Sequence, residues 1–116
     1  AFLEAAKRFA RGGFDVIIDG IVGPWFLEPW LKAVQDHYEV HYIILRATRD
    51  VTMKRAINRT KLDKNSNMEL VEKMWEQFNN LGRYESNIID TTNQSIEQSV
   101  STIKAVIEQK TSLLTI

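Results

Sequence analysis

Three short apolar segments, each followed by a polar turn and then a helical pattern, constrain the fold most strongly. They are residues 14–20 (FDVIIDG), 40–47 (VHYIILRA) and 87–93 (NIIDTTN). Short β-branched runs of this kind are typical of strands covered on both faces. Strands that alternate with helices predict parallel βαβ units, so the sequence indicates an α/β fold. In such sheets ligands bind outside the carboxyl ends of the strands, which makes the three turns the expected location of functional residues.

The composition excludes several classes of protein. The 116 residues include 15 basic and 15 acidic side chains, so no basic surface indicates nucleic-acid binding. Cysteine is absent, which excludes disulfides, thiolate zinc sites and thiol nucleophiles. The longest apolar runs are far shorter than a membrane span, and no signal peptide is recognised. We therefore expect one cytoplasmic domain that binds neither nucleic acid nor membranes.

Amphipathic patterns and helix-ending residues predict about five helices. The first carries an apolar face over residues 2–10, and Gly12 and Gly13 end it because glycine adopts positive φ readily. Pro24 suits the first position of a second helix, which Pro29 either kinks or restarts.

Capping residues mark the other helices. Thr48 or Asp50 caps the third helix, and residues 60–67 form a polar loop. Gly82 is expected to end the fourth helix. Two capping boxes open the last two helices; they pair Ser66 with Glu69 and Ser95 with Gln98.

Asp19 is the first candidate for chemistry, because it ends an apolar strand beside a glycine. A carboxylate at this position can hold a hydrated magnesium ion or accept a proton from a substrate hydroxyl. It can equally cap the turn that follows, and position alone does not decide between the two roles.

Arg55 and Arg59 are four residues apart, so a helix presents both guanidinium groups on one face. Beside a polar loop, such a pair suits a lid that closes over phosphates. The alternative is a solvated helix face, which is the commoner situation for an isolated pair. Arg46 and Arg49 add positive potential near the second strand without needing to touch a ligand.

The turn after the third strand and the aromatic residues after the first are weaker candidates. Residues 90–93 (DTTN) offer polar partners to a base, or form an ordinary turn before a helix cap. Trp25 and Trp30 suit a pocket wall, although packing of an amphipathic helix is the commoner explanation for such residues. His37 and His41 lack the partner ligands of a metal site.

Taken in order, these residues resemble the P-loop small-molecule kinases, which include adenylate, shikimate and gluconate kinases and chloramphenicol phosphotransferase. The stretch GFDVIIDGIVGPW resembles the strand of adenylate kinases that ends in Asp-Gly. The stretch YIILRATRDVTMKRAINRT resembles the next strand and the lid-bearing helix of these kinases. The stretch WEQFNNLGRYESNIIDTTNQSIEQSVSTI resembles their closing helix, strand and helix.

The resemblance implies that residues 1–116 are the C-terminal part of a single kinase-like domain. The family has a three-layer parallel sheet with strand order 2-3-1-4-5, of which this chain supplies the equivalents of strands 3, 4 and 5. The N-terminal βαβ unit is missing, and the sequence contains neither GxxxxGK[ST] nor GxGxxG. The sheet therefore lacks its central strand and its phosphate-binding loop.

The resemblance also implies a function for the complete parent protein, which transfers the γ-phosphoryl group of ATP, with Mg²⁺, to an unknown small molecule. By this resemblance Arg55 stacks on adenine, and Thr91, Thr92 and Asn93 line the base. Arg59 neutralises phosphoryl charge, and Asp19 supports magnesium or the acceptor. Trp25 and Trp30 border the acceptor. The isolated chain is expected to be inactive, because the missing loop supplies most of the positioning and charge neutralisation.

Two other classes remain open from the sequence. One is a self-contained, non-enzymatic α/β binding or interaction module, which needs no phosphate loop. The other is a different α/β enzyme, such as a flavodoxin-like domain with an unusual phosphate loop. If the central strand is missing, we expect the first two strands to pair into a three-stranded sheet, or two chains to associate through unpaired strand edges.

Overall fold

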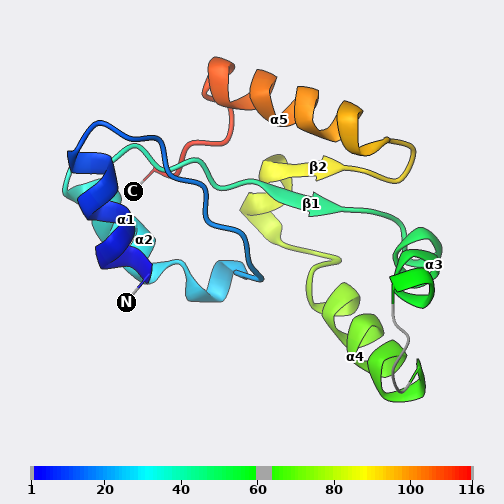
Figure 1. The fold of residues 1–116 in the computed structure, drawn as a ribbon. Coiled ribbons are helices and arrows are strands. Elements are labelled where there is room, and N and C mark those ends of the chain that lie inside the picture. The colour runs from blue at the N-terminus through cyan, green and yellow to red at the C-terminus, as the bar shows by residue number, and fades with distance from the viewer. Residues whose placement is uncertain (1, 60–63, 116) are drawn as a thin grey trace. The chain divides into compact units, whose positions relative to one another are not determined.

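The computed structural model describes residues 2–59 and 64–115, and it has a mixed α/β fold (Figure 1). Its elements are α1 (Phe2–Arg11), α2 (Glu28–Gln35), β1 (Ile44–Arg46), α3 (Arg49–Arg59), α4 (Lys64–Gln77), β2 (Ile88–Asp90) and α5 (Ile96–Gln109), with 3₁₀ helices at Pro24–Phe26 and Gly82–Asn87. The alternation of helices and strands confirms the α/β class that the sequence predicts. No helix in these described ranges is both long and apolar enough to cross a membrane.

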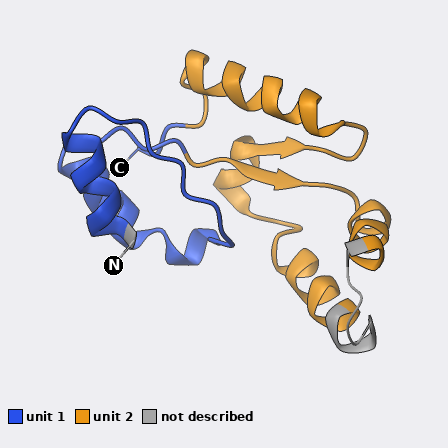
Figure 2. Ribbon diagram, viewed as in Figure 1, with its two compact units in different colours: residues 1–41, 113–116 blue, residues 42–112 orange. Residues whose placement is uncertain are grey.

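The chain divides into two compact units (Figure 2). Unit 1 consists of residues 1–41 and 113–116, and it contains α1 and α2. Unit 2 consists of residues 42–112, and it contains both strands together with α3, α4 and α5. The residues singled out from the sequence are therefore divided between the two units.

The two strands of unit 2 form a parallel pair. In their register Ile44 lies opposite Ile88 and Arg46 lies opposite Asp90. The backbone N–H of Thr91 continues the ladder by donating to the carbonyl of Arg46 at 2.8 Å. Because parallel strands need a crossover connection, α3 and α4 lie between them in the chain, as the sequence predicts.

A buried amide joins the beginnings of the strands to the end of α5. Asn87 is 8% exposed, and its Nδ2 donates to the carbonyls of Tyr42 at 2.9 Å and Ser112 at 3.3 Å. The backbone N–H of Tyr42 also donates to the carbonyl of Ser112 at 2.9 Å. A buried polar group is tolerated when its hydrogen bonds are satisfied, so Asn87 is a structural residue.

Unit 1 is held by a smaller set of contacts. Leu27 and Ala33 are almost completely buried, and Lys7 of α1 reaches Asp36 at 3.5 Å. The C-terminal segment pairs with the end of this unit, since the N–H of Leu114 donates to the carbonyl of Val40 at 2.8 Å.

The predicted strand at residues 14–20 is wrong, because this segment forms no strand. Within the described ranges, residues 15–21 make no backbone hydrogen bond, and Ile17 is 93% exposed. A strand is stabilised by its partner, so a β-branched sequence without a neighbouring backbone stays irregular. The described residues therefore form a two-stranded sheet rather than three strands, and the predicted pairing of the first two strands within the chain is absent.

Four local features confirm predictions made from the sequence. Gly13 has a φ of 90° just after α1, and Pro24 begins a 3₁₀ helix. Pro29 lies in the first turn of α2, so a helix restarts there. Ser95 and Gln98 make both hydrogen bonds of the predicted capping box.

The ends of α4 differ from the prediction. This helix begins at Lys64, inside the predicted loop, and ends at Gln77, before Gly82. Ser66 therefore lies within the helix and is not its cap, because a capping pattern does not force a start where the preceding residues can also be helical. Residues 60–63 of the predicted loop lie outside the described residues.

We predict that Asn87→Ala lowers the free energy of unfolding by about 1–3 kcal/mol, because it removes the Asn87 donor from the Tyr42 carbonyl and one of the two donors from the Ser112 carbonyl. Urea unfolding followed by circular dichroism measures the change. Asn79→Ala, at an exposed position, is the matched control and should change stability by less than about 0.5 kcal/mol. Equal effects of the two substitutions would contradict the role assigned to Asn87.

Candidate functional site

The candidate site lies at the carboxyl ends of β1 and β2 in unit 2. Two hydrogen bonds connect the turns that follow these strands. The N–H of Thr91 donates to the carbonyl of Arg46, and the N–H of Thr48 donates to Thr92 Oγ1 at 2.9 Å. The N-terminus of α3 and the turn before α5 are therefore held side by side, as expected for neighbouring parallel strands.

Arg55 connects α3 to this turn through two hydrogen bonds. Its Nη1 donates to Thr91 Oγ1 at 3.0 Å, and its Nη2 donates to the Thr91 carbonyl at 2.7 Å. Thr91 is 8% exposed. Because both bonds use the edge of the guanidinium group, they fix its plane and leave its flat faces free of these contacts. Arg55 and Thr91, two predicted ligand-binding residues, thus meet in the structure.

Asp90 and Thr92 hold each other in a local turn. Asp90 Oδ1 accepts hydrogen bonds from the hydroxyl and the backbone N–H of Thr92. These two bonds, the hydroxyl first, lower the pKa of the exposed Asp90 carboxyl group. Since Thr92 Oγ1 also accepts from Thr48, its hydroxyl is already used within the protein. Thr92 therefore shapes the turn.

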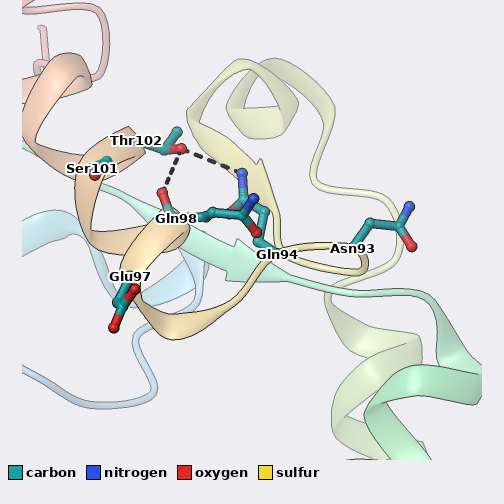
Figure 3. Close-up of a pocket in the computed structure, with 6 residues that line it drawn as sticks. All are labelled: Asn93, Gln94, Glu97, Gln98, Ser101 and Thr102. Carbon is teal, nitrogen blue, oxygen red and sulfur yellow. Dashed lines mark hydrogen bonds between the residues drawn. The ribbon is translucent and has the colours of Figure 1, made fainter.

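An open pocket lined by polar residues lies beside this turn, along the first half of α5 (Figure 3). It is lined by Asn93, Gln94, Glu97, Gln98, Ser101 and Thr102. The Gln94 side chain is engaged, because it donates to Thr102 Oγ1 at 3.3 Å and accepts from Ser99 Oγ at 2.9 Å. The Asn93 side chain points away from the α5 residues and is exposed, so its amide remains able to meet a ligand.

Arg46 belongs to a structural network at the end of β1. It donates to both carboxylate oxygens of Glu85, at 2.9 and 3.1 Å, and to the carbonyl of Phe78 at 2.8 Å. The bond from Arg46, and then the N–H of Leu81, lower the pKa of Glu85. A bidentate arginine–carboxylate pair fixes both orientation and position. Arg46 therefore anchors the segment after α4.

Two more contacts position α4. The indole Nε1 of Trp75 donates to the carbonyl of Ala47 at 2.9 Å, and Arg49 of α3 forms an ion pair with Glu72. The prediction that Arg46 and Arg49 need not touch a ligand is consistent with these internal partners. Neither Trp75 nor Glu85 is singled out by the sequence, since their partners lie far along the chain.

The other predicted site residues lie in unit 1, not in the unit that contains Arg55 and Thr91. Asp19 is exposed at the end of the unpaired segment, Trp25 is 53% exposed in the 3₁₀ helix, and Trp30 is partly buried in α2. Trp25 lies across Gly23, where a Cβ atom would come within 2.3 Å of its ring. In residues 2–59 and 64–115, no group of three or more histidine, aspartate or glutamate side chains is placed to hold a metal ion. The residues of unit 1 therefore provide exposed aromatic surface and single carboxylates.

Arg59 lies at the end of α3, one turn after Arg55, and its side chain is outside the described residues. The structure thus brings together Arg55, Thr91, Thr92 and Asn93. Asp19, Trp25 and Trp30 belong to the other unit.

Comparison with known proteins finds no family model that matches this chain and no matching curated protein.

The Arg46–Glu85 pair predicts a specific pH dependence. A carboxyl group whose pKa is lowered by folding stabilises the protein above its unfolded pKa, about 4.3, and this contribution is lost as pH falls through the lower folded value. We expect Glu85→Gln to be less stable than the wild type at neutral pH, and to lose less stability on acidification.

Denaturant unfolding between neutral pH and about pH 3 measures this difference. Glu108→Gln, at an exposed position of α5, is the matched control and should follow the wild-type curve. Parallel pH profiles for Glu85→Gln and the wild type would show that the pair contributes nothing.

Proposed function

We propose that this chain supplies the base-binding end of an ATP site in a small-molecule kinase or phosphotransferase of the P-loop type. The observation that carries the proposal is the pair of hydrogen bonds from Arg55 to Thr91. These bonds hold a planar cation at the carboxyl end of a parallel strand pair, where α/β proteins bind ligands.

The geometry around Arg55 suits a purine. The guanidinium edge is bound to Thr91 and Arg55 is an exposed residue, so in this proposal an aromatic ring stacks on a flat face of the guanidinium group. The exposed amide of Asn93 has both a donor and an acceptor for the edge of a base. In this proposal Thr91 and Thr92 position Arg55 and the turn, and Asn93 contacts the base.

The strand arrangement also supports the proposal. The parallel neighbours β1 and β2 correspond to strands 4 and 5 of the kinase order, which are adjacent. The unpaired residues 14–20 correspond to strand 3, whose neighbours in the family are strands 2 and 1. We therefore retain, as part of the proposal, a partial three-layer kinase sheet without its N-terminal βαβ unit.

The phosphate end of the site needs residues beyond those described. We assign Arg59 to phosphoryl charge. Asp19, Trp25 and Trp30 belong to the other unit, and they keep the roles that the resemblance implies for the parent protein, with Asp19 at Mg²⁺ or the acceptor and the two tryptophans beside the acceptor. Asp19 has no neighbouring acidic cluster among the described residues, so magnesium enters this proposal only together with the phosphates of ATP. In the complete enzyme ATP supplies the phosphoryl group, and the isolated chain is expected to bind weakly and not to catalyse.

The second candidate is a self-contained, non-enzymatic binding module. It is favoured by the sequence, which has no phosphate loop, and by Arg46 and Arg49, whose charges are paired within the protein. A module of this kind would bind nucleotide poorly or not at all.

We predict that the chain binds adenosine with a Kd of about 1 mM, or about −4 kcal/mol, and that ATP binds no more than about tenfold tighter. The small advantage of ATP follows from the missing phosphate contacts. Titration followed by NMR should shift the amides of residues 91–93 and the side-chain N–H signals of Arg55.

Arg55→Lys keeps the charge but loses the planar fork, so adenosine binding should weaken severalfold. Arg49→Lys, on the same helix and paired with Glu72, is the matched control and should bind as the wild type does. Micromolar ATP binding, or adenosine shifts that avoid residues 91–93, would contradict the proposal. The first result would favour a self-sufficient nucleotide-binding domain.

A further inference from the structure

The segment between α1 and the first 3₁₀ helix exposes an unusual amount of apolar surface. The exposed fractions are 65% for Phe14, 40% for Val16, 93% for Ile17, 41% for Ile18 and 67% for Ile21. Contiguous apolar surface on a protein commonly marks a site of interaction. Five large apolar side chains within eight residues are therefore a candidate docking surface.

The backbone of this segment is also available. Among the described residues, positions 15–21 form no backbone hydrogen bond, although the composition is β-branched and typical of a strand. Unpaired N–H and C=O groups next to β-branched side chains are a template for the addition of another strand. Strand pairing would satisfy the backbone and cover the apolar side chains together.

Charge indicates what kind of strand fits. In a strand conformation Asp15, Ile17 and Asp19 share one face, because side chains alternate. Residues 14–28 contain three acidic side chains, Asp15, Asp19 and Glu28, and no basic one. Lysine or arginine opposite the two aspartates, with an apolar residue between them, complements this face.

The same charges argue against a second copy of the chain as the occupant. Antiparallel self-pairing about Ile17 places Asp15 opposite Asp19 of the other copy, twice per pair. Parallel self-pairing in register places each aspartate against itself. Like charges directly opposite each other destabilise a pair of strands.

We propose that residues 14–20 bind, by strand addition, an extended segment of another protein in which two basic residues, four apart, flank a β-branched residue. The aspartates select the basic side chains, and the apolar residues supply the contact area. The inference uses only a segment of unit 1 and does not rest on the kinase proposal, in which strands of the parent protein itself would flank residues 14–20.

The test titrates the full 116-residue chain with a blocked basic heptapeptide, TKVVVKT, and its acidic counterpart, TEVVVET. NMR should show shifts of the amides of residues 14–20, and the basic peptide should bind about tenfold tighter than the acidic one. Equal affinities, or no shifts in this segment, would overturn the proposal.

Two variants sharpen the test. Asp15→Lys combined with Asp19→Lys should reverse the preference between the peptides, whereas Glu97→Lys with Glu108→Lys, which changes net charge equally, should not. Ile17→Pro should abolish binding by removing an N–H and blocking the pairing, while circular dichroism stays unchanged because Ile17 is 93% exposed.

Sedimentation equilibrium of the chain without peptide completes the test. A monomer across the concentration range supports a free segment that accepts another protein. A dimer that Ile17→Pro dissociates would show that a second copy occupies the segment, and would overturn the proposal.

Discussion

The carboxyl end of β1 is the point on which the rest of unit 2 depends. Three consecutive residues there are bound by two other parts of the chain. The carbonyl of Arg46 accepts from Thr91, the carbonyl of Ala47 accepts from Trp75, and the N–H of Thr48 donates to Thr92. Backbone groups at the end of a strand must find partners, and here the partners are the turn after β2 and helix α4. Residues 46–48 thus fix the positions of both the turn after β2 and helix α4.

The arginines around this point have different roles because they have different partners. Arg46 forms an ion pair with Glu85, which positions the segment after α4, and Arg49 forms one with Glu72 of α4 itself. Arg55 binds neutral groups of Thr91 instead. Its charge is therefore not neutralised by those contacts, and this difference makes Arg55 the preferred candidate for a ligand.

The sequence predicted features that depend on local interactions. The capping box of Ser95 and Gln98 and the positive φ of Gly13 are determined by residues a few positions apart. The family resemblance also implied that Arg55 and Thr91 lie around the same base. Their hydrogen-bond pattern was not foreseen.

Features that depend on distant partners could not be predicted. Residues 14–20 have the composition of a strand, but composition does not supply the neighbouring backbone that a strand requires. Glu85 has no sequence signal, because its partner Arg46 is 39 residues away. The start of α4 at Lys64 shows that a capping pattern is one of several competing local solutions.

Native-state hydrogen exchange tests the central claim most directly, namely that the carboxyl end of β1 organises unit 2 while residues 15–21 remain unpaired. We expect the amide protons of Thr91 and Tyr42, which donate to backbone carbonyls, to exchange slowly. The amides of residues 15–21 should exchange at rates close to those of an unfolded peptide. Protection of residues 15–21 equal to that of Thr91, or rapid exchange of Thr91 itself, would contradict this account.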